Sequence, residues 1–161
     1  MKRVLVDQES EAEIMYPNLY NGLNLEPKDL TGYDSPLLGF DGKVVVPKDH
    51  IRLPVQARSE VVEVDFIMVD AYSPYTTIIV RPWLHALGIV SSTLHLKVKY
   101  PSGDQIEELV RSKFVARQCL SLQLCIGLKL GSWPLLIGAY NNQGFQCYSW
   151  MRYQKGQSVR S

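Results

Sequence analysis

Alternation of apolar and polar residues is the dominant pattern in the first hundred residues of the chain. It runs through residues 51–56 and 94–100, and in Glu60–Val69 it places the apolar residues Val62, Val64, Phe66 and Met68 on one face. A period of two residues is typical of strands with one buried face. Several short strands separated by Pro and Gly favour a small all-β barrel or sandwich.

A tight hairpin is predicted between two of these strands. Val44–Val46 follows Asp41-Gly42-Lys43, and Gly39 stands at the other side of the same polar segment. Glycines on both sides of a short polar stretch permit the backbone angles that a hairpin tip needs. Residues 39–43 are therefore expected to form a hairpin tip.

Helical patterns are scarce. Arg81–Leu87 predicts a short helix, because Pro82 suits a first turn and Gly88 suits the exit from a last turn. A second helix could begin with Ser10 as its N-cap, but Pro17 is expected to interrupt it. Residues 105–120 fit neither a strand nor a helix pattern clearly, so one short helix is expected.

The pattern changes at Leu120. Leu and Ile alternate with small or polar residues as far as Leu130, and no acidic residue follows Glu108. A membrane span over 120–139 is disfavoured, because Lys129 alone opposes insertion by roughly 2.5–3.5 kcal/mol. We expect an exposed strand-like or disordered tail. The predicted organisation is one domain at residues 2–118 and an unassigned segment at 119–161, for which disorder and a frameshift are the open explanations.

Composition narrows the function classes. The 161 residues suit one domain, and a formal net charge of +1 without a basic run argues against nucleic acid as a partner. Three cysteines without Cys-x-x-Cys spacing indicate neither a disulfide framework nor a zinc site. Only three apolar residues follow Lys2 and Arg3, too few for a signal-peptide core. An intracellular, cytoplasmic protein without cofactor or metal is expected.

One acidic residue has a setting that suits catalysis. The signatures of serine hydrolases, phosphate-binding loops, dinucleotide-binding folds and zinc peptidases are missing from the sequence. Val4–Val6, however, delivers Asp7 to the polar turn Gln8-Glu9-Ser10. Two carboxyl groups that share one proton can activate water, because like charges about 3 Å apart separate their pKa values. The alternative, that Asp7 only ends the strand, stays open on these local features.

Three segments of the chain resemble a known family, and this resemblance favours the hypothesis that Asp7 is catalytic. The segments are RVLVDQESEAEIMYPNLYNGLNL (3–25), LLGFDGKVVVPKDHIRLPV (37–55) and FIMVDAYSPYTTIIVRPWLHALGIVSSTLHLKVKYPSG (66–103). They resemble the active-site segment, the flap hairpin and the segment ending in a Pro-Trp-Leu helix of the retropepsin-like aspartic protease. This protease region occurs in the polyproteins of plant gypsy-type long-terminal-repeat retrotransposons. The resemblance covers about residues 2–118.

This resemblance implies a closed β-barrel that works as a homodimer and processes a polyprotein. Asp7 would be the catalytic acid, in an active-site turn formed by Gln8, Glu9 and Ser10. Phe40, Asp41 and Gly42 would lie in the flap over a peptide substrate. Asp34 is the nearest second candidate, but Pro36 stands where a Gly would be wanted. With one suitable acid per chain, the catalytic pair must come from two chains.

Departures from the family pattern predict impaired catalysis. Glu9 and Val80 each stand where the family has Gly, and Glu9 would add bulk and a third carboxylate beside the catalytic pair. Met1 begins almost on the active-site strand, so the domain is expected to be truncated at its N-terminus. The alternatives are an inactive relic of the same fold, reused for dimerisation or peptide binding, and an unrelated small β-protein in which Asp7 is a cap.

Overall fold

The computed structural model describes residues 3–38, 44–47, 49–57, 60–92, 97–110, 112–130, 146–148 and 152–153. These residues form mostly β-structure, in agreement with the predicted class. The strands are β1 (Val4–Val6), β2 (Ile14–Met15), β3 (Thr31–Gly32), β4 (Leu37–Leu38), β5 (Val44–Val45), β6 (Asp49–Ala57), β7 (Glu60–Met68), β8 (Thr77–Ile79), β9 (Val90–Ser92), β10 (Lys97–Ser102), β11 (Gln105–Val110), β12 (Gln146–Tyr148) and β13 (Arg152–Tyr153). The helices are α1 (Pro17–Gly22), α2 (Arg81–Ala86), α3 (Lys113–Leu130) and the 3₁₀ turn η1 (Pro27–Asp29).

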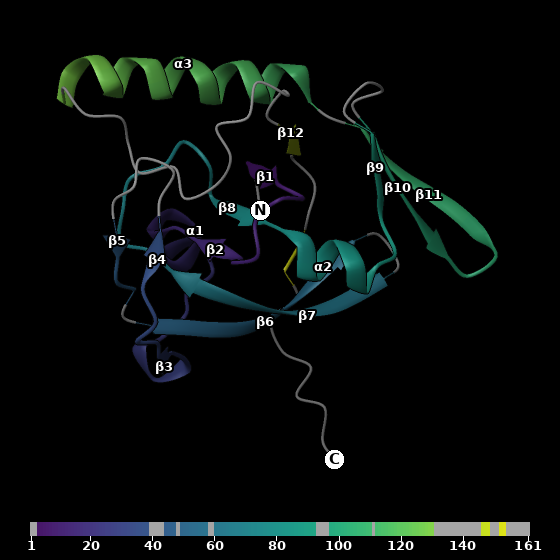
Figure 1. Cartoon of the computed structure of the whole chain (residues 1–161), viewed down its shortest axis with the longest axis horizontal. Helices are drawn as coiled ribbons and strands as arrows, with labels where there is room; N and C mark the ends of the chain where they lie inside the picture. Colours follow the sequence, from purple (N-terminus) through teal and green to yellow (C-terminus); the bar gives the residue numbers. More distant parts are fainter. Residues whose placement is uncertain are drawn as a thin grey trace.

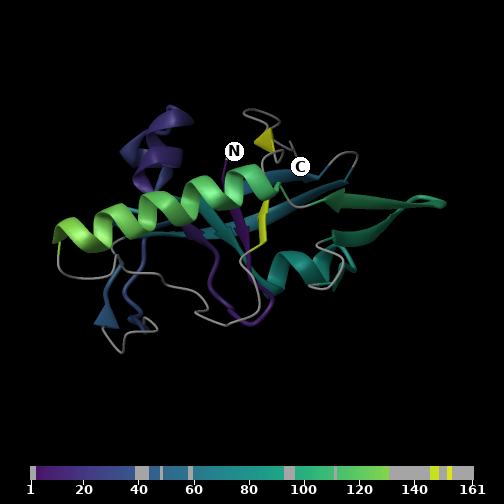
Figure 2. The same cartoon turned by 90° about the horizontal axis from the view of Figure 1, so that it is seen from above.

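Eight of these strands form the main sheet. Its order is β12-β1-β8-β2-β7-β6-β13, with β3 also paired to β6. Strands β9, β10 and β11 form a separate antiparallel sheet, and β4 pairs with β5. Figure 1 shows α3 running along one side of the main sheet, and both views place the three-stranded sheet at one end of the molecule (Figures 1 and 2).

The longest hairpin follows directly from the alternating pattern. Strands β6 and β7 pair antiparallel from His50–Ile67 to Ala57–Glu60. The apolar residues of β6 that alternate with polar ones are buried: Ile51, Leu53, Val55 and Ala57. They share one hydrophobic cluster with Val64 and Phe66 of β7. A period of two therefore predicted these strands correctly, because one face of each packs on the core.

At the centre of the main sheet, strands β1 and β8 bring Asp7 next to Val80. Strand β1 runs parallel to β8, with Val6 opposite Ile79, so Asp7 and Val80 leave the sheet side by side. Strand β2 lies between β8 and β7, antiparallel to the first and parallel to the second. The segment between β1 and β2 must therefore turn back over the start of α2, which follows β8 directly.

The predicted helix over 81–87 is confirmed as α2, but the prediction of a single helix is wrong. Pro17 begins α1 instead of interrupting a helix, since a proline at the first helical position loses no intrahelical hydrogen bond. The ambiguous segment divides into β11 and α3. Residues 120–130, expected to be strand-like or disordered, continue α3, which begins at Lys113 and buries Ala116 and Cys119 against the second hydrophobic cluster.

The predicted closed barrel is not formed by the described strands. The main sheet is an open path whose ends are β12 and β13. The free edge of β1 pairs with β12 and the edge of β6 pairs with β13, so these two edges do not pair with each other. Both end strands are short, of three and two residues, and they terminate the sheet without closing it.

The predicted boundary between residues 118 and 119 falls within α3. Strands β12 and β13, from the segment that was left unassigned, belong to the same sheet as β1 and β6. None of the helices in the described part of the chain is long and apolar enough to cross a membrane.

Candidate functional site

Asp7 stands at the end of β1 and is 7% exposed. Its backbone N–H donates to the carbonyl of Ile79 at 2.9 Å, which continues the parallel ladder of β1 and β8 by one residue. Its carboxylate accepts two bonds from the turn that follows: Oδ1 from the Glu9 N–H at 2.9 Å and Oδ2 from the Ser10 hydroxyl at 2.6 Å. One acceptor position on each oxygen is thereby used and another remains.

The turn that carries Asp7 is formed without backbone strain. Among the described residues Asn24 is the only non-glycine with a positive φ, so Glu9 does not need the left-handed conformation that favours Gly. Its side chain points outward and is exposed. Val80 has an extended backbone, with φ −129°, and is completely buried among apolar neighbours. Within a single chain, both replacements of an expected Gly are accommodated.

Arg81 holds this turn from the outside. Its Nε donates to the Gln8 carbonyl at 3.3 Å and its Nη2 donates to the Glu9 carbonyl at 3.0 Å. Its Nη1 forms an ion pair with Glu11 at 3.1 Å. The planar guanidinium can reach several acceptors at once, which suits it to fix a short loop. The same residue donates its backbone N–H to the Ser10 carbonyl at 3.2 Å.

Glu13 is a second buried carboxyl group close to the turn, with 4% of its surface exposed. Its Oε2 accepts from the Val80 N–H at 2.8 Å and its Oε1 accepts from the Trp83 N–H at 3.1 Å. Burial raises the pKa of Glu13 to about 8, although the two N–H donors oppose part of this shift. Glu13 therefore changes its charge near neutral pH.

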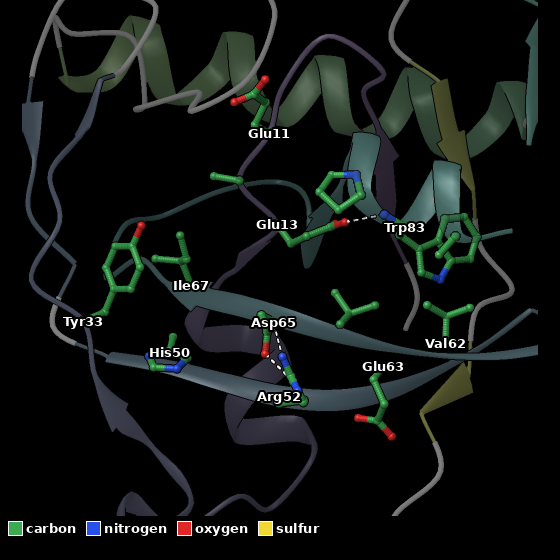
Figure 3. A pocket seen from close by; sticks show the side chains of 14 residues that line it. Glu11, Glu13, Tyr33, His50, Arg52, Val62, Glu63, Asp65, Ile67 and Trp83 are labelled. Carbon is green, nitrogen blue, oxygen red and sulfur yellow. Dashed lines mark hydrogen bonds and ion pairs between the residues drawn. The ribbon is translucent and has the colours of Figure 1, made fainter. Parts of the chain in front are cut away.

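A pocket of about 500 Å³ opens beside Glu13, between α2 and the β6–β7 hairpin (Figure 3). Its polar lining residues are Glu11, Glu13, Tyr33, His50, Arg52, Glu63 and Asp65. Arg52 is committed to Asp65 through two bonds of 2.6 Å. The Glu13 carboxyl points away from that pair and toward the Trp83 N–H (Figure 3). Asp7 does not line this pocket.

The structure brings together the predicted turn residues. Asp7, Glu9 and Ser10 are joined by hydrogen bonds, and Gln8 is joined to Arg81. Strands β4 and β5 pair in the register expected of a hairpin, with Leu38 opposite Val44. Its tip, with Phe40, Asp41 and Gly42, lies outside the described residues. The described residues contain no group of three potential ligands that could hold a metal ion.

Two contributors to the site were missed in the sequence: Arg81 as a clamp and Glu13 as a buried acceptor. A signal for Glu13 was present, since it is an acid between Ala12 and the apolar run Ile14-Met15-Tyr16. An acid within an apolar stretch is buried only with hydrogen-bond partners. No family model matches the chain, and no similar curated protein was found.

Proposed function

We propose that this chain is a retropepsin-like aspartic endopeptidase domain derived from a long-terminal-repeat retrotransposon polyprotein. Asp7 is the catalytic acid, and the working unit is a homodimer that cleaves an extended peptide or polyprotein. The observation that carries the proposal is the setting of Asp7. Its carboxylate lies at a strand end, next to the strand that precedes a Pro-Trp-Leu helix, and is held by a turn N–H and a hydroxyl.

Two features of this setting support hydrolysis by a shared-proton pair. The bonds from Glu9 and Ser10 fix the plane of the Asp7 carboxylate, and a fixed orientation is what a proton-sharing partner requires. Each oxygen keeps an acceptor position for a water or for a second carboxyl group. In the dimer, one Asp7 takes a proton from water while its symmetry mate donates one to the peptide carbonyl.

Glu9 favours a second candidate, a catalytically silent module of the same fold. Its exposed carboxylate stands two residues from Asp7. In a dimer, two such groups would flank two acids that already repel each other, and the shared proton could be held at the wrong site. Such a module could still dimerise or bind an extended peptide along a sheet edge.

Cleavage of a peptide library near pH 5 tests the proposal, with the parent, Asp7→Asn and Glu9→Gly compared at equal concentration. Activity in the parent that Asp7→Asn abolishes supports the peptidase. Silence in the parent with activity in Glu9→Gly supports a sound scaffold silenced at the turn. Silence in all three, together with a monomer in sedimentation, would overturn the peptidase proposal.

A further inference from the structure

Helix α2 begins without a cap of its own. The residue before it, Val80, has no polar side chain, and Pro82 in the first turn has no N–H. The first N–H groups of any helix lack intrahelical partners. Those of Val80 and Trp83 donate to Glu13, and that of Arg81 donates to the Ser10 carbonyl. The start of α2 therefore depends on residues 10–13 for its acceptors.

The same helix start carries the clamp on the Asp7 turn. Arg81 is the first residue of α2, and its guanidinium holds the carbonyls of Gln8 and Glu9. Glu13 fixes the start of the helix through its bonds to Val80 and Trp83, on either side of Arg81. The position of Arg81 follows from the position of the helix start. A chain of contacts thus runs from Glu13 through α2 to the turn.

We infer that Glu13 is a positioning residue for the Asp7 turn, acting through the start of α2 and through Arg81, and that its charge state sets how firmly the turn is held. Its importance for catalysis rests on the proposed peptidase function. The structural link does not, and it can be measured in an inactive protein.

The charge state matters because an ionised carboxylate is a stronger acceptor than a neutral carboxyl group. Burial, which raises the pKa of Glu13 to about 8, keeps the group neutral in acid and lets it ionise above neutrality. The groups that line the same pocket are Glu11 and Tyr33, His50 and Arg52 of β6, and Glu63 and Asp65 of β7. Since Arg52 is bonded to Asp65, its charge is directed away from Glu13. Ionisation of Glu13 should tighten the bonds to Val80 and Trp83.

Nuclear magnetic resonance of the labelled full chain tests the link directly. Between pH 6 and 9.5 we expect the ¹⁵N shifts of Arg81 Nε and the Glu9 amide to follow one transition near pH 8. Glu13→Gln should abolish that transition in both signals. Glu63→Gln is the matched control: it removes an exposed carboxylate from the same pocket and should leave the transition in place.

The inference is overturned if Glu13 titrates in its own carboxyl signal while Arg81 and Glu9 do not respond. It is also overturned if their transition persists in Glu13→Gln. Neither outcome depends on cleavage of any substrate, so failure of this inference is distinct from failure of the peptidase proposal. The wild-type titration requires no variant, so the test holds even where a substitution at Glu13 prevents folding.

Where cleavage that depends on Asp7 is measured, Glu13 has a second readout. Glu13→Ala should lower kcat by about 100-fold with KM within about twofold, because a displaced turn misaligns the carboxyl without removing substrate contacts. Glu13→Gln, whose amide oxygen can accept from only one of the Val80 and Trp83 N–H groups, should recover part of that loss. Equal losses of kcat in both variants, or a change confined to KM, would contradict a positioning role.

Discussion

Asp7 and Glu13 are both buried carboxyl groups, six positions apart, but they find their partners in opposite ways. Asp7 is bonded by residues two and three positions further on. Glu13 is bonded by residues 67 and 70 positions away. A local contact can form in a short segment of chain, whereas the long-range contact exists only when β2, β8 and α2 are assembled. The comparison separates a carboxyl group held within its own turn from one that ties β2 to the start of α2.

The largest loss of stability is expected from Glu13→Ala. The substitution leaves the buried N–H groups of Val80 and Trp83 without acceptors, and each such group costs about 1–3 kcal/mol. We expect the free energy of unfolding at pH 7 to fall by about 4 kcal/mol in urea denaturation. Glu63→Ala, in the same pocket but exposed, is the control and should change little. A loss below about 1 kcal/mol would contradict the role of Glu13 as an acceptor for α2.

The next largest effect is expected in the pH dependence of stability, through Glu13. The pKa of Glu13 is about 8 in the folded chain against 4.5 for an exposed Glu, so the folded state binds more protons between these values. Stability must then fall as pH rises through this window, by at most about 1.4 kcal/mol per pH unit, and level off above pH 8. Between pH 5.5 and 8 the wild type should lose about 3 kcal/mol more than Glu13→Gln. Parallel curves for the two proteins would refute this.

Removing the clamp should have a smaller effect. Arg81→Met deletes the bonds to the Gln8 and Glu9 carbonyls and the ion pair with Glu11, but the Arg81 side chain is 41% exposed and partly screened. We expect a loss of about 1.5 kcal/mol in chemical denaturation. Arg81→Lys should restore little of it, since an ammonium group cannot span two carbonyls as a guanidinium does. Full recovery in Lys would show that charge alone matters.

Ser10→Ala should have a smaller effect than Arg81→Met. It removes the hydroxyl that bonds Asp7 Oδ2 and leaves the Glu9 N–H in place, for a loss of about 1 kcal/mol. Thermal denaturation checks this value. Arg52→Gln, which breaks an exposed ion pair with Asp65, sets the lower bound and should barely move the midpoint. A larger effect for Arg52 than for Ser10 would reverse the expected order.

The sequence predicted those parts of the molecule whose causes are local. Strands β6 and β7 follow from a strict period of two, and α2 follows from Pro82 and Gly88. The polar turn after Asp7 was predictable for the same reason, because its residues are adjacent in the sequence. The role of Glu13 could not, because its partners become neighbours only when Ile14 pairs with Ile78.

Two failures have equally physical causes. Pro17 is compatible with both the end and the start of a helix, and only the packing of α1, which buries Leu19, selects the start. Alternation after Leu120 suggested a strand, yet the segment continues a helix that begins at Lys113. Tertiary contacts such as the burial of Cys119 outweighed the local pattern.

Because β1 pairs with β12, the main sheet cannot be completed until residues 146–148 have been translated. Residues 4–6 emerge from the ribosome well before residues 146–148, which pair with them on one side. At 5–20 residues per second, roughly ten seconds separate the two strands. Throughout that interval the hydrogen-bonding edge of the strand that leads to Asp7 is open to other chains, so a nascent polypeptide of this kind would call for chaperone protection.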